Sequence, residues 1–369
     1  MVSRATLTDL GVVSALGCGC DATARRLFAG EAPGFRRLAL QTGGDETFFG
    51  FADLPPSAFA AAPTRVAALL DAAVAQLDLA SLYRAVAPAR VGAVLGTSNS
   101  TMEEFTDRPD VIDMGYPAAR LRETWGVGGP AWCVSTACSS SGKAFDSARR
   151  LLDEGICDAV LVGGADAATR TVIEGFHALE ALSPRRTRPL SADRDGISLG
   201  EGAAVFVMRR ADSGIALLGV GESSDAYHLT APDPEGRGAE AAMRAALSDA
   251  GLPPEAVDYV NLHGTGTVYN DAMECAAVRR VFGDGVACSS TKPLTGHCLG
   301  AAGAIEAAIC FLALRRGRGL PPHVVASVDP ALAPFPVPRV GDGTPVKTAL
   351  SNSFAFGGSN ASVLLGRIG

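Results

Sequence analysis

The stretch "CVSTACSSSGKAFDSARRLLDEG" (133–155) joins a short apolar run, a cysteine, three serines and an amphipathic segment. Apolar residues after Cys138 recur at intervals of three and four. This spacing predicts one buried helix face formed by Ala144, Phe145, Ala148, Leu151 and Leu152. Gly155 is expected to end this helix. The apolar runs "AWCVS" before it and "DAVLVGG" after it are typical of strands. The stretch therefore predicts a strand–helix–strand unit with parallel strands and Cys138 at the amino end of the helix.

The second half of the chain repeats this plan. "VACSS" is a predicted strand, "TKPLTGH" a loop, and "LGAAGAIEAAICFLALRRG" a helix that ends at Gly317. "KTALSNSFAFGGSNASVLLG" predicts two strands around a Gly-Gly turn. "ATLTDLGVVSALG" near the start also has an echo in "IALLGVGESSDAY". We interpret the chain as an α/β protein with an internal duplication, its halves spanning 1–212 and 213–369.

Composition narrows the class of protein. Hydrophobic residues make up 47% of the chain and charged residues 19%, as in globular proteins with a sizeable core. The net charge of -7 and the lack of a long basic stretch argue against nucleic-acid binding. No charge-free apolar segment is long enough to span a membrane. The nine cysteines lack paired spacing, so we expect free thiols, a cytoplasmic location and no metal site.

Cys138 is the candidate nucleophile. A buried cysteine usually has no chemical role, but at a helix amino terminus the dipole and unpaired N–H groups favour the thiolate and can hold an oxyanion. Nucleophilic catalysis also needs a base or donor, and the chain has only five histidines. His263 and His297 each follow a predicted strand and lie beside glycines, whereas His177 and His323 are expected to be structural.

Other motifs exclude several enzyme classes. "HGTGT" lacks the Lys-Ser/Thr spacing of a phosphate-binding loop. The chain has no Gly-x-Ser-x-Gly nucleophile elbow of a serine hydrolase. It also has no Gly-x-Gly-x-x-Gly fingerprint placed for a nicotinamide cofactor.

Six motifs together resemble the elongating β-ketoacyl-acyl carrier protein synthases of the thiolase-fold superfamily. They follow one another in the family's order over nearly the whole chain: "STACSSS" (135–141), "ALSPRRTRPLSADRDGISLGEGAA" (181–204), "SSDAYH" (223–228), "HGTGTVYND" (263–271), "SSTKPLTGHCLGAAGAIE" (289–306) and "SNSFAFGGSNAS" (351–362). The resemblance implies two duplicated α/β halves in a five-layered αβαβα core. It also implies decarboxylative Claisen condensation of an acyl thioester with malonyl-acyl carrier protein.

The resemblance implies a role for each matching catalytic residue. Cys138 would carry the acyl group as a thioester. His263 and His297 would bind the malonyl thioester carbonyl and stabilise the enolate left after carbon dioxide departs. Lys292 and Glu306 would hold this histidine network in place.

Further matching positions would bind the substrates. The backbone amides of Cys138 and Phe356 would form the oxyanion hole, and the Phe356 ring would be a gate between the two substrates. Thr265 and Thr267 would hydrogen-bond the pantetheine arm. Arg188, within the arginine-rich stretch "SPRRTRP", would dock the acyl carrier protein.

The resemblance also implies partners. The substrates would arrive on the phosphopantetheine of acyl carrier protein, and no other cofactor is expected. A homodimer, or a heterodimer with a ketosynthase-like subunit, would form along the strand "AWCVS". Two alternatives stay open: a thiolase or initiating synthase, and a non-condensing subunit that sets chain length. The retained Cys138, His263 and His297 argue against both.

Two departures from the family pattern concern the acyl pocket. "GTSNSTMEEF" (96–105) replaces a glycine-richer loop, and Ala355 stands where the family usually has glycine. These departures favour a specialised enzyme, such as an aryl polyene-type ketosynthase in polyene or polyketide synthesis, over the main fatty-acid enzyme. The segment 100–125 shows no clear periodicity and is expected to be an irregular insertion near the site.

Overall fold

The computed structural model of the chain describes residues 4–41, 44–102, 113–167 and 169–369. The strands are β1 (Arg4–Ser14), β2 (Gly17–Cys18), β3 (Phe35–Ala39), β4 (Glu46–Gly50), β5 (Val91–Gly96), β6 (Ala131–Val134), β7 (Ala159–Asp166), β8 (Gly202–Ala211), β9 (Gly214–Ser224), β10 (Tyr259–Asn261), β11 (Ala287–Ser289), β12 (Thr348–Phe354) and β13 (Ser359–Ile368). The α-helices are α1 (Cys20–Ala29), α2 (Pro56–Ala61), α3 (Arg65–Val74), α4 (Leu79–Ala85), α5 (Tyr116–Trp125), α6 (Ser140–Asp153), α7 (Arg170–Ala178), α8 (Arg237–Ala250), α9 (Val268–Phe282), α10 (Lys292–Thr295) and α11 (Ala302–Arg316).

The sheet consists of two halves with the same pairing pattern. The first half runs β1-β8-β7-β5-β6 and the second runs β9-β13-β12-β10-β11. In each half the first three strands are antiparallel and the last two join in parallel. Only Thr6 with Ala216 and Leu7 with Ile215 pair β1 with β9. The repeated pattern is the one expected for duplicated halves, whereas the boundary at 212/213 remains a prediction.

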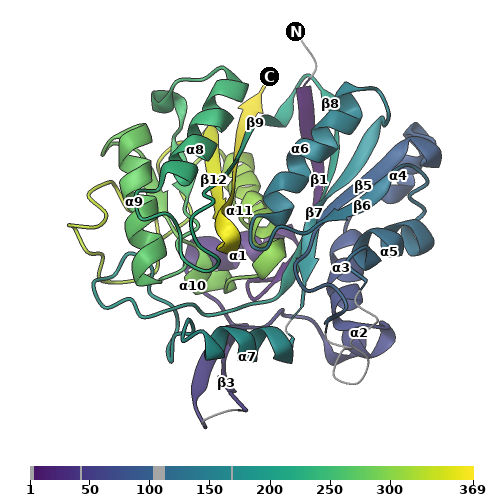
Figure 1. Cartoon of the computed structure of the whole chain (residues 1–369). Coiled ribbons are helices and arrows are strands. Elements are labelled where there is room, and N and C mark those ends of the chain that lie inside the picture. The colour runs from purple at the N-terminus through teal and green to yellow at the C-terminus, as the bar shows by residue number, and fades with distance from the viewer. Residues whose placement is uncertain (1–3, 42–43, 103–112, 168) are drawn as a thin grey trace.

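The elements form five layers, as the sequence predicted. α6 and α11 lie in the middle and contact strands of both half-sheets (Figure 1). α3 covers the outer face of the first half-sheet, with α5 beside it, and α8 covers the outer face of the second, with α9 beside it. The order is therefore helix, sheet, helix, sheet, helix.

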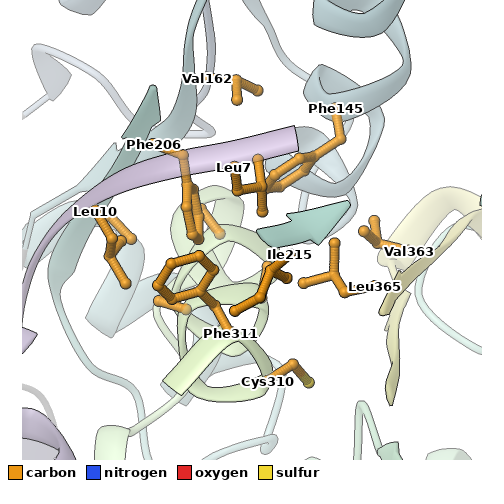
Figure 2. Packing of buried hydrophobic residues seen from close by; sticks show 14 of the residues in the cluster. Leu7, Leu10, Phe145, Val162, Phe206, Ile215, Cys310, Phe311, Val363 and Leu365 are labelled. Carbon is orange, nitrogen blue, oxygen red and sulfur yellow. The ribbon is translucent and has the colours of Figure 1, made fainter. Parts of the chain in front are cut away.

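The core of the middle layer is apolar and aromatic. Phe206 of β8 meets Phe145 of α6 at 5.6 Å and Phe311 of α11 at 5.7 Å between ring centroids, in edge-to-face geometry (Figure 2). Such pairs add about 0.5–1.5 kcal/mol beyond the burial of their area. Leu7 and Ile215, from the two strands that join the half-sheets, pack into the same cluster. This packing fixes α6 and α11, and with them the loops that carry the site.

The predicted helices are confirmed and end at the expected glycines, although α11 begins at Ala302 rather than at Leu299. The predicted loop "TKPLTGH" is wrong in part, because Lys292–Thr295 form the short helix α10. α6 buries the five apolar residues of the expected face and ends just before Gly155, whose φ is 63°. α11 ends at Gly317 in the left-handed conformation, with a φ of 75°. β6 and β7 are parallel as predicted, but β5 lies between them and pairs with both.

The expected irregular insertion at 100–125 is wrong in part. Residues 116–125 form α5, which packs against α3 and the strand β6. Pro117 stands in its first turn and Gly126 ends it in the left-handed conformation. Residues 103–112 of this segment, and with them the end of "GTSNSTMEEF", lie outside the described residues.

Within the described residues, no single helix is both long and apolar enough to cross a membrane. α3 and α4 satisfy that test only together, across a bend of 65°.

Candidate active site

Loops from both half-sheets bring the predicted catalytic residues together. Cys138 lies between β6 and α6, two residues before the helix starts. His263 follows β10 directly, and His297 follows α10. The Cys138 Sγ atom and one ring nitrogen of each histidine all lie within 4.8 Å of one another. Three residues that are far apart in the sequence therefore form one buried group.

The nucleophile loop has a constrained backbone. Ala137, directly before Cys138, has a φ of 52°, which is uncommon for a residue other than glycine. The Ser140 side chain accepts a hydrogen bond from the Thr136 amide at 2.9 Å and donates one to the Ala137 carbonyl at 2.5 Å. Gly96 of β5 allows the helix start to approach closely, because a Cβ there would lie 2.2 Å from the Ser141 nitrogen. These contacts fix Cys138 at the start of α6.

Cys138 is paired with His297. Its Sγ atom lies 2.9 Å from the His297 Nε2 atom. Burial raises the pKa of the Cys138 thiol to about 12, although Lys292 and the Phe356 amide act in the opposite direction. This burial opposes the thiolate that the helix terminus was expected to favour. The thiol lies beside an imidazole that can accept its proton.

Both histidines lie in surroundings that favour the neutral imidazole. Burial lowers the pKa of His263 and of His297 well below the usual range, and the charge of Lys292 lowers each further. The two rings meet edge to face, with centroids 5.2 Å apart. Ser198 and Gly200 hold His297 through backbone hydrogen bonds at 2.8 Å and 3.0 Å.

Lys292 fixes the orientation of His263. Its ammonium group donates to the His263 carbonyl and lies 3.4 Å from the His263 Nδ1 atom. A lysine ammonium can only donate, so Nδ1 accepts and the ring proton sits on Nε2. Glu306 of α11 accepts a hydrogen bond from Lys292 at 2.5 Å. Burial raises the pKa of Glu306 to about 7, against the lowering effect of Lys292.

Phe356 lies in the turn between β12 and β13, directly before Gly357 and Gly358. Its backbone N–H lies close enough to the Cys138 sulfur to lower the pKa of the thiol, a position that suits an amide of the expected oxyanion hole. Its ring stacks on Phe176 of α7, with centroids 5.6 Å apart. Phe176 was not among the predicted residues, because a lone phenylalanine on a helix carries no sequence signal for this role.

A second residue that the sequence did not single out is Glu274. This buried carboxylate of α9 accepts hydrogen bonds from the His263 amide at 2.8 Å and the Gly264 amide at 2.7 Å. Burial raises the pKa of Glu274 to about 7. Its place in the helix after "HGTGT" was the available signal, since an acid on the buried face of a helix needs a partner.

A cavity of 350 Å³ leads from the catalytic group to the surface. Thr265 and Thr267 line it, with their hydroxyl oxygens 3.2 Å apart. Gly266 permits the tight turn between them, because a Cβ there would lie 2.2 Å from the Thr187 hydroxyl. A thioester could therefore reach Cys138 past two hydroxyl groups.

Arg188 is not a free cation. Its guanidinium pairs with Asp193 at 2.6 Å and bonds the Ser327 hydroxyl at 3.2 Å. It lines a separate hollow rather than the cavity that holds Cys138. The structure therefore groups Arg188 apart from the other predicted site residues.

The cysteine and two histidines are donors of the kind that binds zinc. However, Sγ and Nε2 already share a hydrogen bond, and the Lys292 ammonium beside His263 opposes a cation. The geometry suits proton transfer and anion stabilisation better than metal binding.

The fold and this Cys–His–His group define a member of the thiolase-fold superfamily. Comparison with known proteins gives the particular family. Residues 41–213 match the family model "Beta-ketoacyl synthase, N-terminal domain", and residues 215–326 match "Beta-ketoacyl synthase, C-terminal domain". The chain belongs to the β-ketoacyl synthase family.

Individual relatives agree with this assignment. Nodulation protein E of Rhizobium meliloti is 41% identical over 256 residues, which cover 66% of this chain and 63% of that protein. The 3-oxoacyl-[acyl-carrier-protein] synthase 2 of Rhizobium meliloti (strain 1021) is 31% identical over 99% of both chains. The solved ketosynthase ApeO of Xenorhabdus doucetiae, in complex with its chain length factor ApeC, matches with a TM-score of 0.89. It is 39% identical and covers 99% of this chain and 98% of its own.

Proposed function

We propose that the protein is a condensing β-ketoacyl-acyl carrier protein synthase. One observation carries the proposal: the Cys138 thiol lies 2.9 Å from the His297 imidazole, with His263 in the same buried group at the end of a cavity. A non-condensing subunit would have no use for a nucleophile with a proton acceptor and an amide donor around it. The substrates arrive on the phosphopantetheine of acyl carrier protein, and no further cofactor takes part.

The first half-reaction moves an acyl group to Cys138. The thiol passes its proton to His297 Nε2 while the sulfur attacks the acyl thioester carbonyl, and the Phe356 amide stabilises the oxyanion. The carrier thiolate then leaves and takes a proton from solvent, so that His297 keeps the proton on Nε2 and can donate it to the malonyl thioester carbonyl. Acyl enzyme and free carrier thiol result.

The second half-reaction extends the chain. His263 and His297 bind the malonyl thioester carbonyl, and carbon dioxide leaves with formation of an enolate. This carbanion attacks the acyl group on Cys138, and the cysteine sulfur departs and regains its proton from His297 Nε2. Lys292, held by Glu306, keeps the His263 proton on Nε2, where it can stabilise the enolate oxygen.

The test is to supply purified protein with acyl-carrier and malonyl-carrier substrates. Intact-mass measurement should show one acyl group on Cys138, followed by carbon dioxide release and a β-ketoacyl-carrier product. Protein that becomes acylated but never extends the chain would instead be a non-condensing relative. Turnover with a panel of acyl-carrier proteins then shows which acyl chain the enzyme prefers, and this preference tests the aryl polyene-type assignment.

We further propose a dimer along β6, with a second copy or with a ketosynthase-like subunit. Within the described chain β6 pairs only with β5, so its other edge is open, and Trp132 on this strand is 37% exposed. The complex of ApeO with a chain length factor supports a heterodimer. Measured mass in solution, alone and with a co-expressed partner, distinguishes the two.

We also propose that the protein works in the cytoplasm. All nine cysteines are free thiols, which suits a reducing compartment. Detection of the native protein in cell fractions tests this assignment. The role of Arg188 in carrier docking stays a prediction, and its ion pair with Asp193 weakens it.

A further inference from the structure

The route to Cys138 determines where a carrier must sit. The Cys138 side chain is buried, and the cavity that reaches it opens between the end of α7, the segment 225–232, the start of α9 and the turn at Phe356. A phosphopantetheine arm can enter this cavity, whereas the folded body of its carrier must stay outside. The side chains around the opening therefore touch the carrier during each delivery. This reasoning rests on the proposed function.

The opening is surrounded by exposed apolar side chains. Eight large apolar residues of the described chain are markedly exposed, and three of them line the cavity: Leu179, Val268 and Tyr269. Two more, Tyr227 and Leu229, lie in the segment 225–232 beside it, where the Leu229 carbonyl accepts from the Gly357 amide of the Phe356 turn. Their exposed fractions range from 53% to 78%. We call these five residues the entrance collar. Gathered apolar exposure of this kind marks an interaction site, since single exposed residues would scatter over the surface.

The arginines near the opening are already engaged. Arg185 pairs with Asp193 and Asp195, and Arg188 pairs with Asp193. Arg186 donates to the Pro293 carbonyl and lies over the Phe35 ring, while Arg194 donates to the carbonyls of Ser191 and Val268.

Acidic groups line the same cavity. Glu180, Asp195 and Asp225 line it, although Asp195 already pairs with Arg185. Glu180 is exposed at the end of α7. The surroundings of the opening therefore offer an apolar surface and negative charge rather than free positive charge.

We propose that acyl carrier protein docks on the entrance collar chiefly through apolar contacts. The matching surface is a carrier face that presents apolar side chains beside its phosphopantetheinylated serine. Tyr227 and Tyr269 suit this contact, because aromatic side chains give a large contact area with little loss of rotamer freedom. The acidic side chains around the cavity select against carriers with strong negative charge at that face.

The experiment replaces collar residues whose side chains lie outside the cavity wall. Tyr227→Ser and Leu229→Ser each remove an exposed apolar side chain, and Leu229→Ser keeps the carbonyl that accepts from the Gly357 amide. Val340→Ser is the matched control, because Val340 is 55% exposed but lies against Gly30 at the end of α1, outside the elements that surround the opening. Binding of purified holo-carrier is measured directly, and condensation is measured with carrier-bound and with short pantetheine thioesters.

We expect the Kd for holo-carrier and the KM for carrier-bound substrate to rise about tenfold in each collar variant. The kinetics with pantetheine thioesters should stay unchanged, and Val340→Ser should behave as wild type. Wild-type binding should depend only weakly on salt, and Arg188→Glu should have a small effect.

Unchanged carrier binding in both collar variants would overturn the inference. So would steep salt dependence combined with a large loss of binding in Arg188→Glu, because that pattern belongs to electrostatic docking. Failure of the proposed function has a different signature: wild-type protein would bind carrier yet condense no thioester, including the pantetheine forms.

Discussion

Replacing His297 by alanine tests which group takes the proton from Cys138. The buried thiol has a pKa raised to about 12, so at pH 7 only about one unassisted thiol in 10⁵ would be ionised. Forming the thiolate without help would cost about 7 kcal/mol. The His297 Nε2 atom at 2.9 Å can accept the proton as the sulfur attacks. General-base assistance contributes typically 10²–10⁴-fold, and we expect acylation of Cys138 to slow by about that factor in His297→Ala.

His263→Ala provides the matched comparison. The hydrogen bond of Cys138 runs to His297, so acylation should change little in this variant. Decarboxylation should fall by about 10²–10³-fold, because the enolate loses one of its donors. Rapid quenching with intact-mass detection gives the rate of acylation, and carbon dioxide release from malonyl-carrier gives the rate of decarboxylation. Acylation of His297→Ala at the wild-type rate, or equal loss of acylation in both variants, would refute this division of roles.

Three further changes test other parts of the site and fold. Cys138→Ala should abolish condensation, whereas Cys138→Gln should keep decarboxylation because its amide resembles the acylated state; chain extension by Cys138→Ala would contradict the assigned nucleophile. Glu306 is neutral below its pKa of about 7 and ionised above it, so decarboxylation should fall as pH drops through that value and the carboxyl loosens its hold on Lys292. Glu306→Gln should be slower and lack this pH step, and a pH profile identical to wild type would exclude the carboxyl as its source. Gly96→Ala should lower the free energy of unfolding by about 1–3 kcal/mol in urea titration, because its Cβ would lie 2.2 Å from the Ser141 nitrogen. Equal stability would show that the start of α6 shifts freely.

The catalytic group was predictable because each of its residues lies in a recognisable local sequence pattern. Cys138 precedes a helix with a clear apolar face, and His263 follows a short buried strand beside a glycine. His297 was also expected after a strand, but in the structure it follows the short helix α10 and Gly296. These residues come together because the two duplicated α/β halves pack against each other, which places loops of both half-sheets side by side. Short motifs are enough to identify these catalytic residues, so their prediction does not require knowledge of long-range contacts.

What the sequence did not predict depends on contacts between distant segments. The raised pKa of Cys138 results from its burial, which opposes the effect expected of the helix terminus. α5 lacks a visible pattern because much of its packing comes from α3 and β6. The position of β5 between β6 and β7 likewise depends on pairing across the chain. By contrast, the ion pair of Arg188 could have been predicted, because Asp193 lies only five residues later in the motif 181–204.

We propose that the double engagement of Phe356 couples the opening of the cavity to the oxyanion hole, through movement of the turn as one unit. Its ring stacks on Phe176 at the cavity wall while its amide faces the Cys138 sulfur. A movement of this turn that swings the ring aside must also carry the amide away from the sulfur. An open passage therefore coincides with a weakened oxyanion hole, and a water molecule that enters while the passage is open meets a thioester that is poorly activated for attack. The turn would in this way protect the loaded acyl chain from wasteful hydrolysis between successive carrier visits.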